Sequence, residues 1–208
     1  MRAISLDRFR LAVALVLPAL LVSAALPAPA DTPQRASLTG QLLVAAPAMG
    51  DPRFRQTVIL MIRHDRTGAF GIVVNRPVGE HPLADLLAAL GQKDSGAAGR
   101  VRIFAGGPVD PERVFVVHSA DYDRPDTLKI DGRVALTASL EVLRDLGSNQ
   151  GPKQSLVAFG YAGWGPGQLE DELTKGAWFT TPQDAKLMFE QDRDKVWDDA
   201  MARRTQDL

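Results

Sequence analysis

Three histidines, His64, His81 and His118, are the side chains of this sequence best suited to proton transfer or metal binding near neutral pH. None of them stands in a His-x-x-x-His or His-Glu-x-x-His spacing, so no metal-binding motif links them. A zinc site of three histidines could still assemble in space. The chain contains no cysteine, which excludes disulfides, thiolate metal sites and a cysteine nucleophile. The sequence therefore implies no metal and no cofactor.

Ser119 invites a comparison with serine hydrolases, because His118 precedes it and Asp121 and Asp123 follow closely. The geometry of such a triad is spatial, however, and adjacency in sequence says little about it. No Gly-x-Ser-x-Gly nucleophile elbow occurs anywhere in the chain. Serine catalysis is therefore not expected.

Polar residues beside glycine and proline turns form a better candidate for function. These residues are Asp51, Arg53, Asn75, Arg76, Gln168 and Glu170. The guanidinium groups of Arg53 and Arg76 are planar donors suited to carboxylate or phosphate. The group could hold a ligand by charge-assisted hydrogen bonds. Alternatively, Arg76 and Glu170 could form an ion pair that only fixes the turn.

The stretch from Gly160 to Glu170 is expected to position this group, since it has four glycines, a proline and two aromatic residues. It predicts a strand, a tight turn and a helix start. Positive φ at Gly163 or Gly165 would make a β-branched replacement costly. Glycine turns can bind anions through their exposed N–H groups. The acids 170–172, however, already complement the positive charge of the helix N-terminus. We expect the side chains of these acids to be solvated. A structural corner and an anion site both remain open.

The candidate ligand-binding residues combine the turn with the polar group. They are Arg53, Asn75, Arg76, Gly163, Trp164, Gly165, Gln168 and Glu170.

Residues 1–30 have the pattern of a secretory signal peptide. Arg2, Arg8 and Arg10 precede an apolar run, 11–26, and Ala28-Pro29-Ala30 supplies a small-residue cleavage site. Pro18 interrupts the run and Pro27 follows it, and the run is too short for a comfortable transmembrane helix. We expect residues 31–208 to form a single periplasmic or secreted domain. The alternatives are an uncleaved anchor and a misassigned start codon, which would leave the protein cytoplasmic.

Apolar runs and turn signals predict short strands joined by hairpins as often as by helices. The predicted strands are 41–46, 57–63, 69–75, 101–104, 114–118, 127–130, 134–137, 155–161 and 177–180. Asp65–Gly68 and Asp131-Gly132 are typical hairpin turns. This alternation favours an α+β fold with a largely antiparallel, coiled sheet.

Four helices are expected between or after these strands. The first opens at Pro82 and ends at Gly91, and the second is capped by Thr137 or Ser139 and ends at Gly147. A short helix follows the glycine-rich turn. The last begins at Thr181-Pro182-Gln183-Asp184, with threonine as cap and proline in the first turn.

Three blocks of the sequence resemble the YqgE/AlgH family. They are 38–54 with 71–77, then 104–109 with 116–119, and Gly160–Glu170. The resemblance spans about 38–197 and implies a bifurcated, curved β-sheet with flanking helices. It implies little about activity, because the family has no established one, although the AlgH name carries a regulatory connotation. Family members usually begin near the Thr39-Gly40-Gln41 block and look cytoplasmic, so the N-terminal extension departs from the pattern.

The favoured function is a non-catalytic binding or regulatory module that holds a small anion or a protein partner at its glycine-rich face. A hydrolase or transferase using the same face is the alternative. Removal of residues 1–30 takes Lys plus Arg from 24 to 21 and Asp plus Glu from 25 to 24, which leaves a net charge of −3. This mild acidity and the lack of a helix-turn-helix pattern disfavour nucleic acid as a partner.

Overall fold

A computed structural model describes residues 36–92, 96–190 and 192–204, which belong to one compact unit. The predicted signal peptide lies outside the described residues. No helix of the described ranges is long and apolar enough to cross a membrane.

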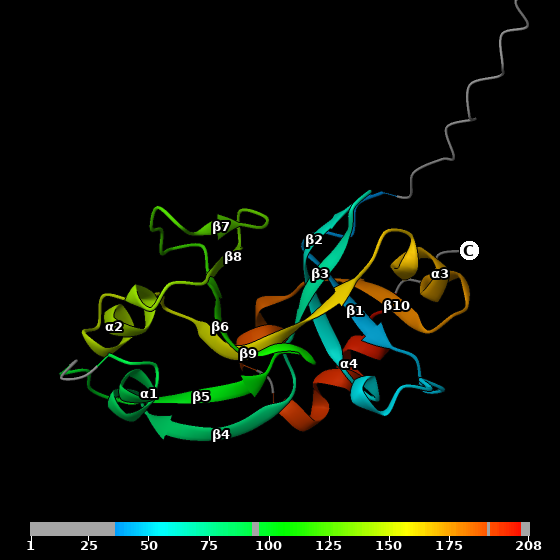
Figure 1. Cartoon of the computed structure of the whole chain (residues 1–208). Coiled ribbons are helices and arrows are strands. Elements are labelled where there is room, and N and C mark those ends of the chain that lie inside the picture. The colour runs from blue at the N-terminus through cyan, green and yellow to red at the C-terminus, as the bar shows by residue number, and fades with distance from the viewer. Residues whose placement is uncertain (1–35, 93–95, 191, 205–208) are drawn as a thin grey trace, which may run out of the picture. The chain divides into compact units, whose positions relative to one another are not determined.

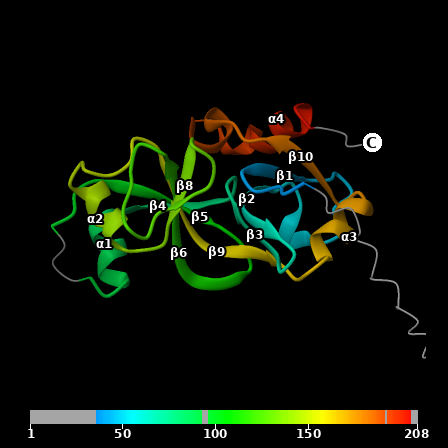
Figure 2. The same cartoon turned by 90° about the horizontal axis from the view of Figure 1, so that it is seen from above.

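Within these ranges, ten strands form one curled, mostly antiparallel sheet (Figures 1 and 2). The strands are β1 (Gln41–Ala45), β2 (Val58–Asp65), β3 (Gly68–Val73), β4 (Pro77–Pro82), β5 (Arg100–Ala105), β6 (Val109–Ser119), β7 (Leu128–Lys129), β8 (Val134–Thr137), β9 (Ser155–Trp164) and β10 (Trp178–Pro182). Their order is β10-β1-β2-β3-β9-β6-β8-β7, and β5 with β4 branches from β9. Among the strand pairs that the structure describes, only that of β5 with β9 is parallel. The predicted α+β class and the bifurcated antiparallel sheet are confirmed.

The sheet divides at β9, which has different partners along its length. Its last residues pair with β3, where Ala69 lies opposite Trp164, while its middle pairs with β5 and, on the other edge, with β6. Gly106 lies at the fork. Its N–H donates to the Phe159 carbonyl at 2.7 Å, and its own carbonyl accepts the Val73 N–H at 2.8 Å. One glycine therefore ties both branches together.

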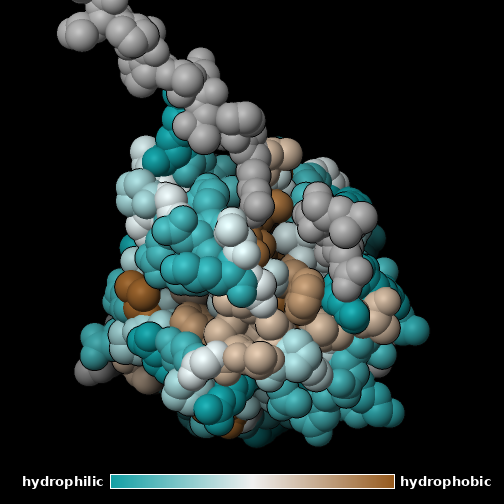
Figure 3. All heavy atoms as spheres, turned by 90° about the vertical axis from the view of Figure 1, so that its right-hand side faces the viewer, coloured by the Kyte–Doolittle hydropathy of each residue, from teal (hydrophilic) through white to brown (hydrophobic). Residues whose placement is uncertain are grey.

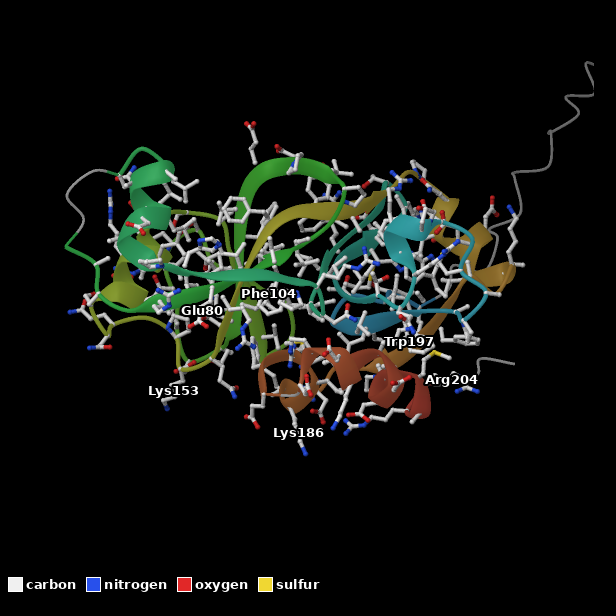
Figure 4. All side chains as sticks on the ribbon, turned by 90° about the horizontal axis from the view of Figure 1, so that it is seen from below. Glu80, Phe104, Lys153, Lys186, Trp197 and Arg204 are labelled. Carbon is white, nitrogen blue, oxygen red and sulfur yellow. The ribbon has the colours of Figure 1, made fainter. Side chains whose placement is uncertain are left out.

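Helical segments cover both faces of the sheet. They are α1 (Leu83–Ala89), α2 (Glu141–Gly147), α3 (Gln168–Thr174) and α4 (Val196–Ala202), with short η1 (Pro52–Phe54), η2 (Lys186–Glu190) and η3 (Arg193–Lys195). Helices α1 and α2 pack on β6 and β9, and α3 packs on β1–β3. Segment η2 and helix α4 close the opposite face over a third apolar cluster. The Trp197 indole N–H donates to the Ala45 carbonyl at 2.9 Å and so anchors α4 to β1 (Figure 4).

Local signals predicted several elements correctly. The β2–β3 hairpin forms around Asp65–Gly68, and α1 ends before Gly91, which has the left-handed φ of +80° that favours glycine. The β7–β8 hairpin also forms, but Lys129 pairs with Ala135, so its loop is longer than Asp131-Gly132.

Other predicted features are wrong for identifiable reasons. Thr181 and Pro182 lie in β10, where Thr181 pairs with Leu42, so the C-terminal helical region begins later and is interrupted. Neither Thr137 nor Ser139 caps α2, because Thr137 Oγ1 contacts His118 and α2 starts after Leu140. Strand β4 was not predicted at all.

Candidate functional site

The glycine-rich stretch forms the predicted strand, turn and helix. Strand β9 ends at Trp164, residues 165–167 turn, and α3 begins at Gln168. We call the exposed residues Gly163, Gly165, Pro166, Gly167 and Gln168 the glycine-rich face. It lies beside α3, on the side of the molecule that faces the viewer in Figure 3.

Positive φ occurs at different glycines from those expected. Gly160 has φ +72° and Gly167 has φ +75°, whereas Gly163 and Gly165 are not among the positive-φ residues. A Cβ atom at Gly160 would lie 2.4 Å from the Gly107 carbonyl oxygen, and one at Gly107 would lie 2.0 Å from the Tyr161 carbonyl carbon. Two backbone segments therefore cross in direct contact here, which only glycine permits.

Gly163 and Gly165 have no comparable internal requirement. Gly163 lies opposite Phe70 on β3, and a Cβ there would meet only the Tyr161 ring, at 3.2 Å. A Cβ at Gly165 would have no protein atom nearer than Gln168 Oε1, at 4.0 Å. Packing within the described residues therefore does not explain these two glycines.

Trp164 and Gln168 belong to a hydrogen-bonded cluster centred on Glu172. Glu172 Oε2 accepts the indole N–H groups of Trp164 at 2.9 Å and Trp178 at 2.8 Å. Its Oε1 accepts the Gln168 amide at 2.9 Å, and Gln168 Oε1 accepts the Gly165 N–H at 3.1 Å. The expectation of a solvated helix start is wrong for Glu172, which fixes the turn onto the core.

Sequence reasoning missed Glu172, although a signal for it was present. Gln168 and Glu172 are four residues apart and so share one face of α3. A pair of tryptophans at 164 and 178 flanks this helix, and buried indole N–H groups need acceptors.

An aromatic line connects this cluster to η1. The Trp164 and Trp178 rings meet edge-on with centroids 6.0 Å apart, and Phe54 meets Trp178 at 5.6 Å. Arg53, the neighbour of Phe54, is 64% exposed and forms a bidentate pair with Asp51, in which Nη2 lies 2.6 Å from Oδ2. The hydrogen bonds from Arg53 lower the pKa of the Asp51 carboxyl, which is therefore ionised at neutral pH.

Asn75 and Arg76 lie beyond the other end of β3 and hold the segment between η1 and β2. Asn75 Oδ1 accepts the Val58 N–H at 2.9 Å, and its amide donates to the Gln56 carbonyl. Arg76 donates from Nη1 to the Arg53 carbonyl at 2.6 Å and from Nη2 to the Arg55 carbonyl at 2.8 Å. Partial burial lowers the pKa of Arg76 from its usual value.

Glu170 pairs with a histidine and not with Arg76. Glu170 Oε1 lies 2.9 Å from His64 Nε2, and His64 Nδ1 accepts the Leu38 N–H at 3.1 Å. This arrangement ties α3 to the residues before β1. The alternative of an Arg76–Glu170 ion pair is therefore wrong, because β3 separates the turn from Asn75 and Arg76.

The structure thus divides the predicted residues. Arg53, Asn75 and Arg76 form one group around η1, and the second group lies at the turn: Gly163, Trp164, Gly165, Gln168 and Glu170. The line of rings from Phe54 through Trp178 to Trp164 joins them.

His118 and Ser119 do not form a catalytic pair. His118 is fully buried, with Nε2 2.9 Å from Thr137 Oγ1 and Nδ1 2.9 Å from the Ser119 carbonyl. Burial lowers the pKa of the His118 imidazole. The Ser119 hydroxyl donates instead to Asp121. Within the described ranges, no three His, Cys, Asp or Glu residues gather as a metal site.

Comparison with known proteins gives a consistent picture. A family model described as AlgH-like matches residues 42–208. A UPF0301 protein of Rhodospirillum rubrum is 48% identical over 153 residues, which cover 74% of this chain and 80% of that protein. A UPF0301 protein of Gluconobacter oxydans is 43% identical over 166 residues, which cover 79% of this chain and 89% of that protein.

Solved structures show the same fold. The solution structure of the AlgH protein from Pseudomonas aeruginosa has a TM-score of 0.69 at 36% identity, over 83% of this chain and 92% of that one. The crystal structure of a Corynebacterium diphtheriae protein, DIP2367, has a TM-score of 0.62 at 22% identity. The match covers 81% of this chain and 87% of that one. The second likeness concerns the fold alone.

Proposed function

The chain belongs to the AlgH-like family, and we propose that it is a non-catalytic binding or regulatory module that acts through its glycine-rich face. The observation that carries this proposal is the exposure of Gly163 and Gly165. Neither has positive φ, and neither avoids a backbone clash inside the molecule. A glycine in or beside a strand without an internal reason often marks a close approach by another molecule.

A protein partner fits this face better than a small anion. Helix α3 has Glu170 and Asp171 in its first turn, and these acids disfavour an anion at its N-terminus. The Gly165 N–H, which could have met an anion, already donates to Gln168. The open glycine backbone remains accessible to the backbone or side chains of a partner.

The groups that could do catalysis are engaged elsewhere. Both ring nitrogens of His64 and of His118 contact other protein atoms, and neither histidine contacts the Ser119 hydroxyl among the residues that the structure describes. The geometry therefore offers the hydrolase or transferase alternative no support. Turnover in a broad hydrolase screen that disappears in Ser119→Ala would reinstate that alternative.

The test compares two glycines of similar environment. Gly165→Val and Gly50→Val each place a side chain in open, exposed space at a residue without positive φ. Both variants should therefore melt close to the wild-type temperature. Tagged wild-type protein, Gly165→Val and Gly50→Val are then purified from the native host, and the proteins recovered with each are quantified by mass spectrometry.

We expect a partner that is recovered with wild type and with Gly50→Val but is depleted with Gly165→Val. Equal recovery of every protein by all three would contradict the proposal. Native mass spectrometry of the purified chain would show whether a bound small molecule, and not a protein, occupies the face.

A further inference from the structure

A shallow cavity of about 620 Å³, wide open to solvent, lies where β6 ends, away from the glycine-rich face. Three chain segments line it: the residues that follow β6, the turn before β8 and the loop before β9. The lining residues are Ser119, Ala120, Asp121, Gly132, Arg133, Lys153 and Gln154. Its volume falls within the range of small-molecule sites.

The three segments are hydrogen-bonded to one another. The Ser119 hydroxyl accepts the Gln154 N–H at 3.1 Å and donates to Asp121 Oδ1, while Asp121 Oδ2 accepts the Lys153 N–H at 3.3 Å. The Ala120 N–H donates to the Arg133 carbonyl at 3.0 Å. The walls are therefore held in place before any ligand arrives, which reduces the entropy cost of binding.

The turn before β8 is fixed independently through Asp131. Asp131 Oδ1 accepts the N–H groups of Arg133 and Val134, both at 3.1 Å, and Oδ2 accepts the Gln183 amide at 3.0 Å. Gln183 is 3% exposed, so this anchor reaches into the core. Arg133 is thus attached to a rigid turn, although its own side chain is 68% exposed.

Charges of both signs line the cavity. Arg133 and Lys153 supply two cations from different segments, and Asp121 supplies one carboxylate. The hydrogen bond from Ser119 lowers the pKa of Asp121, so this group is ionised at neutral pH. Lys153 has no carboxylate within 4.0 Å in the described part of the chain, and Figure 4 shows it at the margin of the molecule.

Each wall group retains capacity for a ligand. A carboxylate oxygen has two lone-pair sites, and the two Asp121 oxygens each accept one hydrogen bond from the protein. Arg133 donates to Asp131 from Nη2 at 3.1 Å, and a guanidinium has five N–H donors. The lining can thus receive an anionic group between the two cations and a hydroxyl donor at Asp121.

We propose that this cavity binds a small hydroxylated organic anion, with its acidic group held by Arg133 and Lys153 and a hydroxyl group donating to Asp121. Arg133 is already paired with Asp131, so the preference for an acid over a neutral polyol rests on Lys153, which has no ion pair within the described residues. A carboxylate and a phosphomonoester share this chemistry, and glycerate and glycerol 3-phosphate represent the two sources.

The test is an NMR titration of the chain from residue 31 to residue 208. The concentration of each probe is raised to about 10 mM, well above a millimolar Kd. Glycerate or glycerol 3-phosphate should shift the amide resonances of Ser119–Asp121 and Lys153–Gln154 to saturation, while glycerol should not. Lys153→Gln removes a cation that no ion pair within the described chain uses, so its spectrum should remain that of a folded protein. It should weaken binding by about tenfold.

Lys129→Gln is the matched control, since Lys129 is also an exposed lysine but pairs with Asp123 outside the cavity lining. It should leave the affinity unchanged. Failure of both acids to saturate these amides would overturn the proposal, as would binding that glycerol reproduces or that Lys153→Gln does not weaken. A preference for one acid identifies the source of the anionic group.

Discussion

The Glu172 carboxylate accepts hydrogen bonds from two indole nitrogens that are shielded from water, since Trp164 and Trp178 are 7% and 3% exposed. Replacing it with leucine would leave both indole N–H groups without an acceptor. We expect Glu172→Leu to lower the free energy of unfolding by about 2–4 kcal/mol, and Glu172→Gln, which keeps a carbonyl oxygen, to cost less. Urea unfolding measures both. Asp171→Leu is the control on the exposed side of α3, and an equal loss there would contradict this role for Glu172.

His118 should make the stability of the protein depend on pH. Burial holds its folded pKa below the ordinary value of 6.5, so the unfolded chain binds a proton more readily than the folded one. Stability from this residue is complete above pH 6.5 and is lost as the pH falls from there through the folded pKa. Urea unfolding at several pH values should give a smaller slope between pH 7 and 5 for His118→Gln than for wild type. An equal slope for the two proteins would contradict this role for His118.

Arg76 stabilises the segment between η1 and β2 through two backbone carbonyls. Arg76→Ala should lower the free energy of unfolding by about 1.5–3 kcal/mol, the usual contribution of hydrogen bonds to a charged group. It should also speed proteolysis within 52–57. Arg55→Ala changes a neighbouring exposed arginine whose side chain has no hydrogen bond or ion pair within the described residues. Equal effects of the two substitutions would show that the carbonyl contacts of Arg76 contribute little.

At the level of elements, the crossing of Gly107 over Gly160 is the place where the backbone tolerates no side chain. Gly107→Ala would force a Cβ to within 2.0 Å of the Tyr161 backbone, so we expect loss of soluble protein or a destabilisation of at least about 3 kcal/mol. Gly163→Ala meets only a movable ring and should change stability by less than about 1 kcal/mol. Thermal melting of the two variants measures this difference in stability. Similar melting temperatures for both variants would contradict the crossing.

Elements with local signals were predictable, and those set by distant contacts were not. The β2–β3 hairpin follows from its turn residues, and α1 from the leucine spacing before Gly91. Strand β4 has a proline at each end and mostly exposed residues, so it lacks a strand pattern and forms only as an edge partner of β5. The fork at β9 depends on partners that are dozens of residues away, which periodicity cannot report.

The same limit applies to the candidate site. Spacing correctly placed the strand, turn and helix around Gly165, because glycine and proline determine local backbone geometry. The sequence spacing could not reveal that Glu170 pairs with His64 or that two tryptophans donate to Glu172. These contacts depend on how separate strands align. The cavity beside Ser119 escaped prediction for the same reason, because three segments build it.

For the molecule as a whole, we propose export followed by cleavage near residue 30, on the basis of the basic, apolar and small-residue pattern of the N-terminus. Sequencing of the protein from its native host should find an N-terminus at or near Asp31. Protein that retains Met1 and fractionates with the cytoplasm would refute the proposal. A substitution of the small residues 28 and 30 by arginine should block cleavage and serves as the control.

The pairing of the first strand with the last has a consequence for synthesis. Leu43 of β1 pairs with Thr180 of β10, and β3 pairs with residues 162–164 of β9, which are synthesised much later. A ribosome releases the chain vectorially, at about 5–20 residues per second, so β1, β2 and β3 emerge several seconds before these partners exist. During that interval the β2–β3 hairpin can form, but the sheet cannot close. Native folding must therefore be largely post-translational, and the nascent chain presents apolar strands that chaperones can bind.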